Sequence, residues 1–145
     1  MRSNSRHFDF KVRGANMMTW NLSCPGENEI IRLELHGELT ADSVLLLVQD
    51  VIRAIEEFSS TVFLVDFRRS VPQMNSFEMY DLTHRLSELG LSRSVKFADI
   101  VPKAFWGDFR FMETLCHNCG YCMSIFIDEE SARGWLLSTN GNGSS

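Results

Sequence analysis

The chain has 145 residues, of which 44% are hydrophobic and 23% are charged, and its formal net charge is −5. This length suits one domain, and this composition is typical of globular proteins and excludes disordered and fibrous ones. The acidic balance argues against binding to nucleic acid, and the N-terminal residues lack the apolar core of a signal peptide or a membrane-inserted helix. We therefore expect a cytoplasmic protein whose four cysteines stay reduced.

The first third of the chain predicts strands. Residues 8–12 and 30–35 alternate apolar and polar side chains, as half-exposed strands do, and residues 17–22 are a further candidate strand. Proline and glycine in Cys24-Pro25-Gly26-Glu27-Asn28 indicate a turn before the segment at 30–35. These segments predict an antiparallel edge of a sheet.

A helix is predicted at residues 41–58. Thr40 is a suitable N-cap, and Asp42 lies in the first turn, where the helix dipole favours a negative charge. An apolar stripe with helical spacing follows, made of Val44, Val48, Val51, Ile55 and Phe58.

The unbroken apolar run at residues 62–65 predicts a strand covered on both faces, which is typical of the centre of an α/β sheet. Asn75 and Glu78 resemble a capping pair at the start of the next helix, and Gly90 ends that helix. The helix buries a stripe made of Met79, Leu82, Leu86 and Leu89.

Residues 95–101 and 123–127 predict two more buried strands, with a helix at 104–118 between them and Gly120 at its left-handed C-terminal position. Asp99 lies inside the first of these strands, and we expect it at an edge or paired with a lysine, Lys96 or Lys103. Asp128 caps a last helix that points Ala132, Trp135 and Leu136 inward.

The predicted fold is therefore α/β, with a mixed, mainly parallel sheet of four to five strands, an antiparallel N-terminal edge and about four helices. We expect one domain at residues 8–137, and disordered tails at 1–7 and 138–145.

Polar residues follow the central strand, where open α/β sheets usually carry their sites. Arg68, Arg69, Ser70, Asn75 and Ser76 predict a site for an anion or an acidic partner, because guanidinium groups and a helix N-terminus both attract negative charge. The alternative is structural, with Asp66 paired to an arginine and Asn75 or Ser76 serving only as a cap.

Cys116, Cys119 and Cys122 have C-x2-C-x2-C spacing, which suits zinc or an iron–sulfur cluster. A second C-x-x-C pair is missing, and Cys116 and Cys119 continue the apolar stripe of Phe105, Phe109 and Met112. We therefore favour buried thiols and expect no metal and no cofactor.

Aromatic residues ring the helix at 104–118 more completely than one buried stripe requires, namely Phe105, Trp106, Phe109 and Phe111. They predict an apolar ligand cavity, a dimer surface or burial under the early strands. No phosphate-binding loop and no nucleophile with a recognisable base partner is present, so we do not expect an enzyme.

Three segments, LELHGELTADS near residues 33–43, VFLVDFRRS at 62–70 and SIFIDEESARGWL at 124–136, resemble small bacterial SpoIIAA-like proteins of the STAS (sulfate transporter and anti-sigma factor antagonist) superfamily. In the anti-sigma-factor antagonists of that superfamily, the loop after the central strand carries an Asp-Ser motif whose serine is phosphorylated. The equivalent here is Asn75-Ser76-Phe77, so the resemblance makes Ser76 the phosphorylation candidate.

The resemblance implies a non-enzymatic regulatory module that recognises a protein partner, a kinase or a regulator, at the loop after the central strand. The alternative is a carrier or sensor of a small apolar or anionic ligand, and a metal or redox protein that uses the cysteine run is a third reading. A homodimer is compatible with both the regulatory module and the ligand carrier or sensor.

Overall fold

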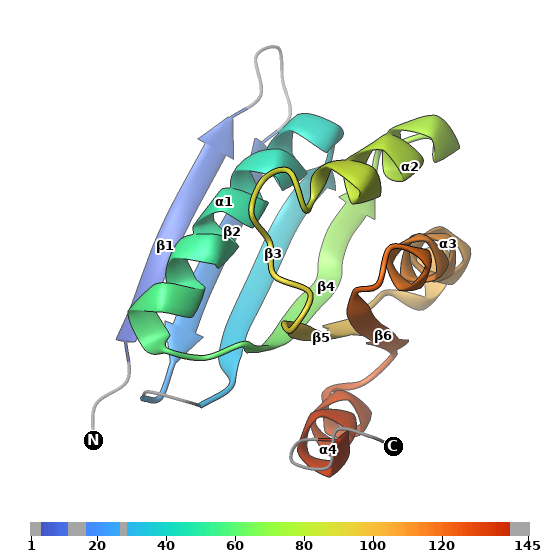
Figure 1. Ribbon diagram of the computed structural model, residues 1–145. Helices are drawn as coiled ribbons and strands as arrows, with labels where there is room; N and C mark the ends of the chain where they lie inside the picture. The colour runs from blue at the N-terminus through green and yellow to red at the C-terminus, as the bar shows by residue number, and fades with distance from the viewer. Residues whose placement is uncertain (1–3, 12–16, 27–28, 140–145) are drawn as a thin grey trace.

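The computed structural model describes residues 4–11, 17–26 and 29–139. It contains one sheet of six strands in the order β1-β2-β3-β4-β5-β6 (Figure 1). The antiparallel N-terminal part consists of β1 (Asn4–Lys11), β2 (Met17–Cys24) and β3 (Ile31–Leu39). Beyond β3 the neighbours are parallel, namely β4 (Val62–Pro72), β5 (Lys96–Ile100) and β6 (Cys122–Phe126). The predicted α/β class with an antiparallel edge is confirmed, with six strands in place of four or five.

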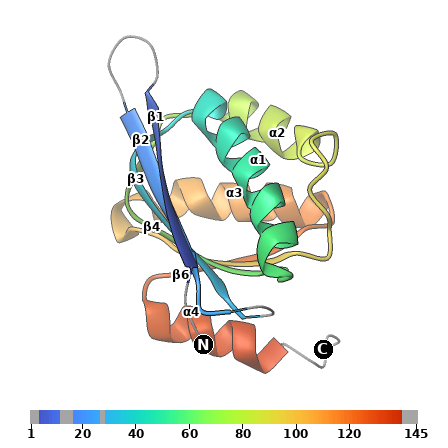
Figure 2. The ribbon, with the colours of Figure 1, turned by 90° about the vertical axis from the view of Figure 1, so that its left-hand side faces the viewer.

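Each parallel connection carries a helix, because parallel strands need a crossover. The helices are α1 (Ala41–Phe58), α2 (Ser76–Arg85), α3 (Trp106–Asn118) and α4 (Glu129–Thr139), with a short 3-10 helix, η1 (Lys103–Phe105), before α3. Figure 2 shows α1, α2 and α3 together on one face of the sheet and α4 on the other. No described helix has the length and apolar character needed to cross a membrane.

The alternation of side chains along the strands divides the core into two parts. Phe63, Val65 and Phe97 belong to the larger part, which α1, α2 and α3 cover. Leu64, Ala98 and Ile100 point the other way and pack against Ala132 and Leu136 of α4. Strands buried on both faces explain the unbroken apolar run of β4.

The N-terminus of α1 shows how a local signal sets an element. The Thr40 hydroxyl accepts a hydrogen bond from the Ser43 amide at 3.2 Å, and the Ser43 hydroxyl accepts one from the Thr40 amide at 3.0 Å. This capping box satisfies two amides that the helix itself leaves without a partner. The predicted helix at 41–58 is confirmed at both ends.

The largest departure from the expected elements is in β4. We expected a loop between Arg68 and Ser76, but its first part extends the strand to Pro72, because β3 continues to pair with it from His36–Arg69 to Leu39–Pro72. A register shift between Glu34 and His36 marks a bulge in this pairing. The backbone hydrogen bonds come from β3, so the polar side chains of this stretch do not end the strand.

Smaller differences concern element ends. β1 begins at Asn4, inside the segment expected as an N-terminal tail, and α4 ends at Thr139. The rest of the expected tails lies outside the described residues. α2 ends at Arg85 and turns lead on to Gly90, which has φ +100°, while the Leu91 amide donates to the Leu86 carbonyl at 3.1 Å. The helix thus ends at Arg85, before the predicted position, and Gly90 instead ends the turns that follow it.

Candidate functional site

The structure divides the five predicted site residues into two groups. Arg68, Arg69 and Ser70 lie within β4, whereas Asn75 and Ser76 begin α2. Among the described residues, no hydrogen bond or ion pair joins one group to the other. Each group must therefore be considered by its own contacts.

Arg68 is committed to a structural ion pair. Its Nε and Nη2 donate to the two carboxylate oxygens of Asp66 at 3.0 and 2.8 Å, and Arg32 donates to the same carboxylate at 3.3 Å. Arg32 also donates to Glu129, at the start of α4, at 2.8 Å. Burial alone would raise the pKa of Asp66, but the hydrogen bonds and charge of Arg68 and Arg32 lower it. This cluster links α4 to β3 and β4. Asp66 is thus paired with an arginine, as the structural alternative predicts.

The other two β4 residues differ in their surroundings. Ser70 is buried, and its hydroxyl donates to the Phe67 carbonyl at 2.7 Å across the bulged part of the strand. Arg69 is exposed and makes no ion pair with any described residue. Of the predicted pair of arginines, Arg69 is therefore the one available to an external anion.

Asn75 and Glu78 form the predicted capping box at the start of α2. The Asn75 side chain accepts from the Glu78 amide at 2.8 Å, and the Glu78 carboxylate accepts from the Asn75 amide at 2.9 Å. Ser76 is the first residue of the helix and is exposed. Its hydroxyl is accessible at a helix N-terminus, where a negative group is favoured.

The sequence did not single out an aromatic face that follows Ser76 on α2. Phe77 is 74% exposed and Tyr80 is 52% exposed, although both are large and apolar. His84 stacks on Tyr80, with ring centroids 4.2 Å apart. The signal was present, because Phe77 and Tyr80 fall outside the buried stripe of α2 and therefore had to face solvent. We call Phe77, Tyr80 and His84 the aromatic face.

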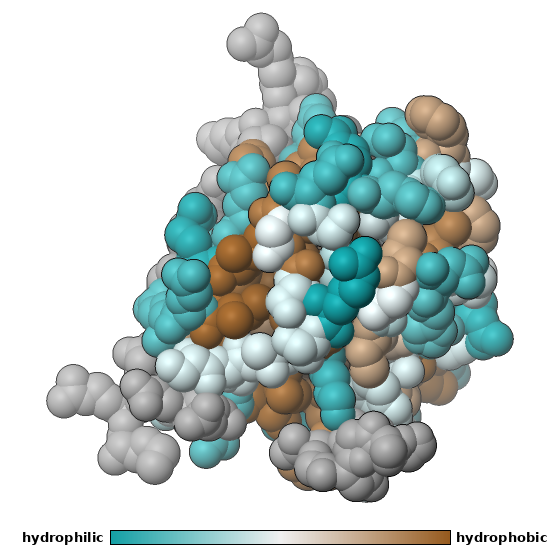
Figure 3. Space-filling model, in the orientation of Figure 1, coloured by the Kyte–Doolittle hydropathy of each residue, from teal (hydrophilic) through white to brown (hydrophobic). Residues whose placement is uncertain are grey.

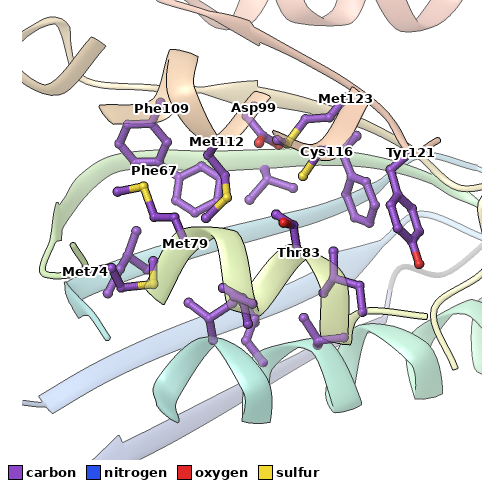
Figure 4. A pocket seen from close by; sticks show the side chains of 18 of the residues that line it. Phe67, Met74, Met79, Thr83, Asp99, Phe109, Met112, Cys116, Tyr121 and Met123 are labelled. Atoms are coloured by element: carbon purple, nitrogen blue, oxygen red, sulfur yellow. The ribbon is translucent and has the colours of Figure 1, made fainter. Parts of the chain in front are cut away.

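A second candidate site is a cavity of about 150 Å³ between the sheet and the three helices that cover it. Its walls come from β4, α1, α2 and α3, and are represented by Phe67, Val48, Met79, Phe109 and Met112 (Figure 4). Apolar side chains also reach the surface nearby, since Leu45, Leu46 and Ile52 of α1 are exposed or half-exposed. Figure 3 shows hydrophobic residues gathered over the middle of α1 within a hydrophilic surround.

One carboxyl group lies in the wall of this cavity. Asp99 is 4% exposed, and it makes neither an ion pair nor a hydrogen bond with any described residue. Burial and the nearby charge of Glu113 raise the pKa of Asp99 well above its ordinary value. The expected position at an edge, or a pairing with Lys96 or Lys103, is therefore wrong. Alternation within β5 explains this, because Phe97 and Asp99 share the face that the helices cover.

The cysteine run does not assemble into a metal site. Within the part of the chain that the structure describes, no group of three or more His, Cys, Asp or Glu side chains is arranged to hold a metal ion. Cys116 is buried, whereas Cys119 and Cys122 are half-buried, and all three are free thiols. Burial raises the pKa of the Cys116 thiol to about 12, so it stays protonated and unreactive.

The comparisons with known proteins bear on the fold. No protein-family model and no curated protein matches the chain. The structure is similar to the crystal structure of an anti-sigma factor antagonist from Mycobacterium paratuberculosis, with a TM-score of 0.50 and 9% sequence identity. The match covers 92% of this chain and 95% of that one. The chain therefore has the fold of an anti-sigma factor antagonist, the fold that its three SpoIIAA-like segments predict.

Proposed function

We propose that the chain is a non-enzymatic regulatory module of STAS type that binds a protein partner through the surface at the start of α2. The observation that carries this proposal is the aromatic face, because exposed aromatic side chains are rare on surfaces that bind nothing and common at the centre of protein interfaces. Ser76 and Tyr80 are four residues apart on α2 and so lie on the same side of the helix, which places the serine hydroxyl next to the aromatic face.

The similar solved structure supports the same proposal, since that protein is titled an anti-sigma factor antagonist. A partner of the corresponding kind is a regulator with an apolar groove for Phe77 and Tyr80. Phosphorylation of Ser76 would switch this contact, because a phosphate adds a charge of about −1.5 to −2 beside the two aromatic rings.

The test compares Phe77→Ser and Tyr80→Ser with Leu137→Ser. Leu137 is 66% exposed but lies on α4, on the opposite face of the sheet, so it controls for the loss of an exposed apolar side chain. A partner is first captured on the wild-type protein and purified, and its affinity for each variant is then measured. We expect the two α2 variants to weaken binding at least tenfold and Leu137→Ser to leave it unchanged. Equal affinities for all three variants would overturn the proposal.

The cavity favours a second function, the carriage or sensing of a small apolar ligand. Its wall includes no lysine, arginine or histidine among the described residues, so it offers no counter-charge to an anionic ligand. Native and denatured masses of the protein, purified from its host under reducing conditions, test both functions together. Extra mass of a small organic molecule in the native form alone supports the second function, whereas a covalent phosphate that maps to Ser76 supports the switch.

A further inference from the structure

Asp99 is the feature of the cavity that the proposed functions leave unexplained. Removing a carboxyl group from water without a hydrogen-bond partner costs several kcal/mol, so buried polar groups are normally paired. Asp99 Oδ1 is buried and has no partner, and the carboxyl lines the cavity. Figure 4 shows it among Met112, Cys116 and Met123. The structure thus holds an unsatisfied polar group against a space that a ligand can fill.

The size of the cavity limits what that ligand can be. A cavity of about 150 Å³ lined mostly by apolar side chains is large enough for benzene. Drug-sized ligands occupy several hundred Å³. The occupant is therefore a compact molecule with roughly the volume of one aromatic ring.

The protonation state of Asp99 limits the polar part of the ligand. Burial favours the protonated form of Asp99. In that form the carboxyl group can both donate and accept a hydrogen bond, and a hydroxyl group can do the same, so the two can satisfy each other. An ammonium group would bring a full charge, and burying a charge costs far more than burying a neutral hydroxyl group. The other carboxylate of the wall, Asp108, is exposed. Thr83 also lines the wall, and its hydroxyl already donates to the Tyr80 carbonyl at 2.9 Å, which leaves it able only to accept.

We propose that the cavity binds a compact apolar molecule that carries one hydroxyl group, and that Asp99 is the residue that selects the hydroxyl. This inference rests on the second proposed function, because it requires the cavity to take a ligand. It goes further in naming the chemistry of that ligand and the residue that recognises it.

The probes for the test are phenol and toluene, which have nearly the same shape and differ in the hydroxyl group. Met74, Met79, Met112 and Met123 all line the cavity, so protein labelled with ¹³C at the methionine methyl groups reports occupancy by NMR. Dissociation constants of both probes are measured for the wild type, Asp99→Val and Asp99→Asn. Met79→Leu, which changes the wall without removing a polar group, is the matched control.

The quantity that decides is the ratio of the toluene to the phenol dissociation constant. Loss of one hydrogen bond to the ligand corresponds to about a tenfold change in affinity. We expect the ratio to fall about tenfold in Asp99→Val, and to stay near the wild-type value in Asp99→Asn and Met79→Leu. If Asp99→Val fails to fold, Asp99→Ala replaces it, because it also removes both polar atoms, and the same fall in the ratio is expected.

Two negative results of this binding experiment would have different meanings. If both probes bind but the ratio is the same in Asp99→Val as in the wild type, the selection by Asp99 is refuted and the cavity remains a ligand site. If neither probe shifts any methionine methyl signal, both this inference and the ligand-carrying function are refuted. The protein-binding function at α2 is unaffected by either result.

Discussion

The free energy of unfolding should fall as the pH rises, because of Asp99. In the unfolded chain this carboxyl titrates near 3.8, whereas burial raises its pKa well above that value in the folded protein. Between these two values the unfolded chain releases a proton that the folded protein keeps. The contribution of Asp99 to stability is therefore fully present below pH 3.8 and decreases by up to about 1.4 kcal/mol for each pH unit above it, until the native pKa is passed.

The surroundings of Asp99 make this effect large. Glu113 on α3 faces it with a like charge, and the titratable side chains that line the cavity are Asp108, Cys116 and Tyr121. No described residue in that wall is a cation that could stabilise the ionised form. Arg110 on α3 lies 3.5 Å from Glu113 and is engaged there.

Asp99→Asn tests whether the pKa of Asp99 is raised, because the variant removes the titrating carboxyl group and keeps the shape of the side chain. Urea unfolding of the wild type and the variant at pH 5, 6, 7 and 8 should show the variant gaining relative stability by up to about 1.4 kcal/mol per unit. Thr83→Val, which alters a polar group of the same cavity that does not titrate, should differ from the wild type by a constant amount. A constant difference for Asp99→Asn as well would refute a raised pKa.

Three further variants test other parts of the structure. Asn75→Ala should lower the free energy of unfolding by about 1 kcal/mol through loss of the α2 cap, and Asn75→Ser should restore most of it in urea titrations. Cys116 should resist iodoacetamide at pH 8 in the folded protein and react after denaturation, as peptide mapping would show; equal rates would contradict its burial. Glu129→Gln should weaken the contact with Arg32 by about 1 kcal/mol and speed proteolysis at α4, whereas the exposed Glu130→Gln should not.

Elements defined by local signals were predictable from the sequence. The bounds of α1 follow from the Thr40 cap and one apolar stripe, and the left-handed Gly120, with φ +88°, follows from its place after the last apolar residue of α3. Asn75 caps α2 as its spacing to Glu78 predicts. In each case the interacting residues are close in sequence, so a short stretch of sequence is enough to predict the interaction.

Features set by distant contacts were not predictable in the same way. β4 extends to Pro72 because β3 supplies its hydrogen bonds, and nothing in residues 67–72 reveals that partner. The cost of burying a carboxyl group argues for an edge position of Asp99, whereas its alternation with Phe97 on β5 places it on the face that the helices cover. The cavity itself depends on how three helices pack, which no single stretch of sequence specifies.

The position of α4 has a consequence for how the protein is made. α4 is the last of the described elements and covers Leu64, Ala98 and Ile100, on two strands that are complete many residues earlier. At synthesis rates of about 5–20 residues per second, that apolar sheet face is uncovered for seconds after β5 has emerged from the ribosome. During this interval the exposed apolar surface makes the nascent chain prone to aggregation. The sheet face is covered once α4 docks and the Glu129 carboxylate accepts its hydrogen bond from Arg32.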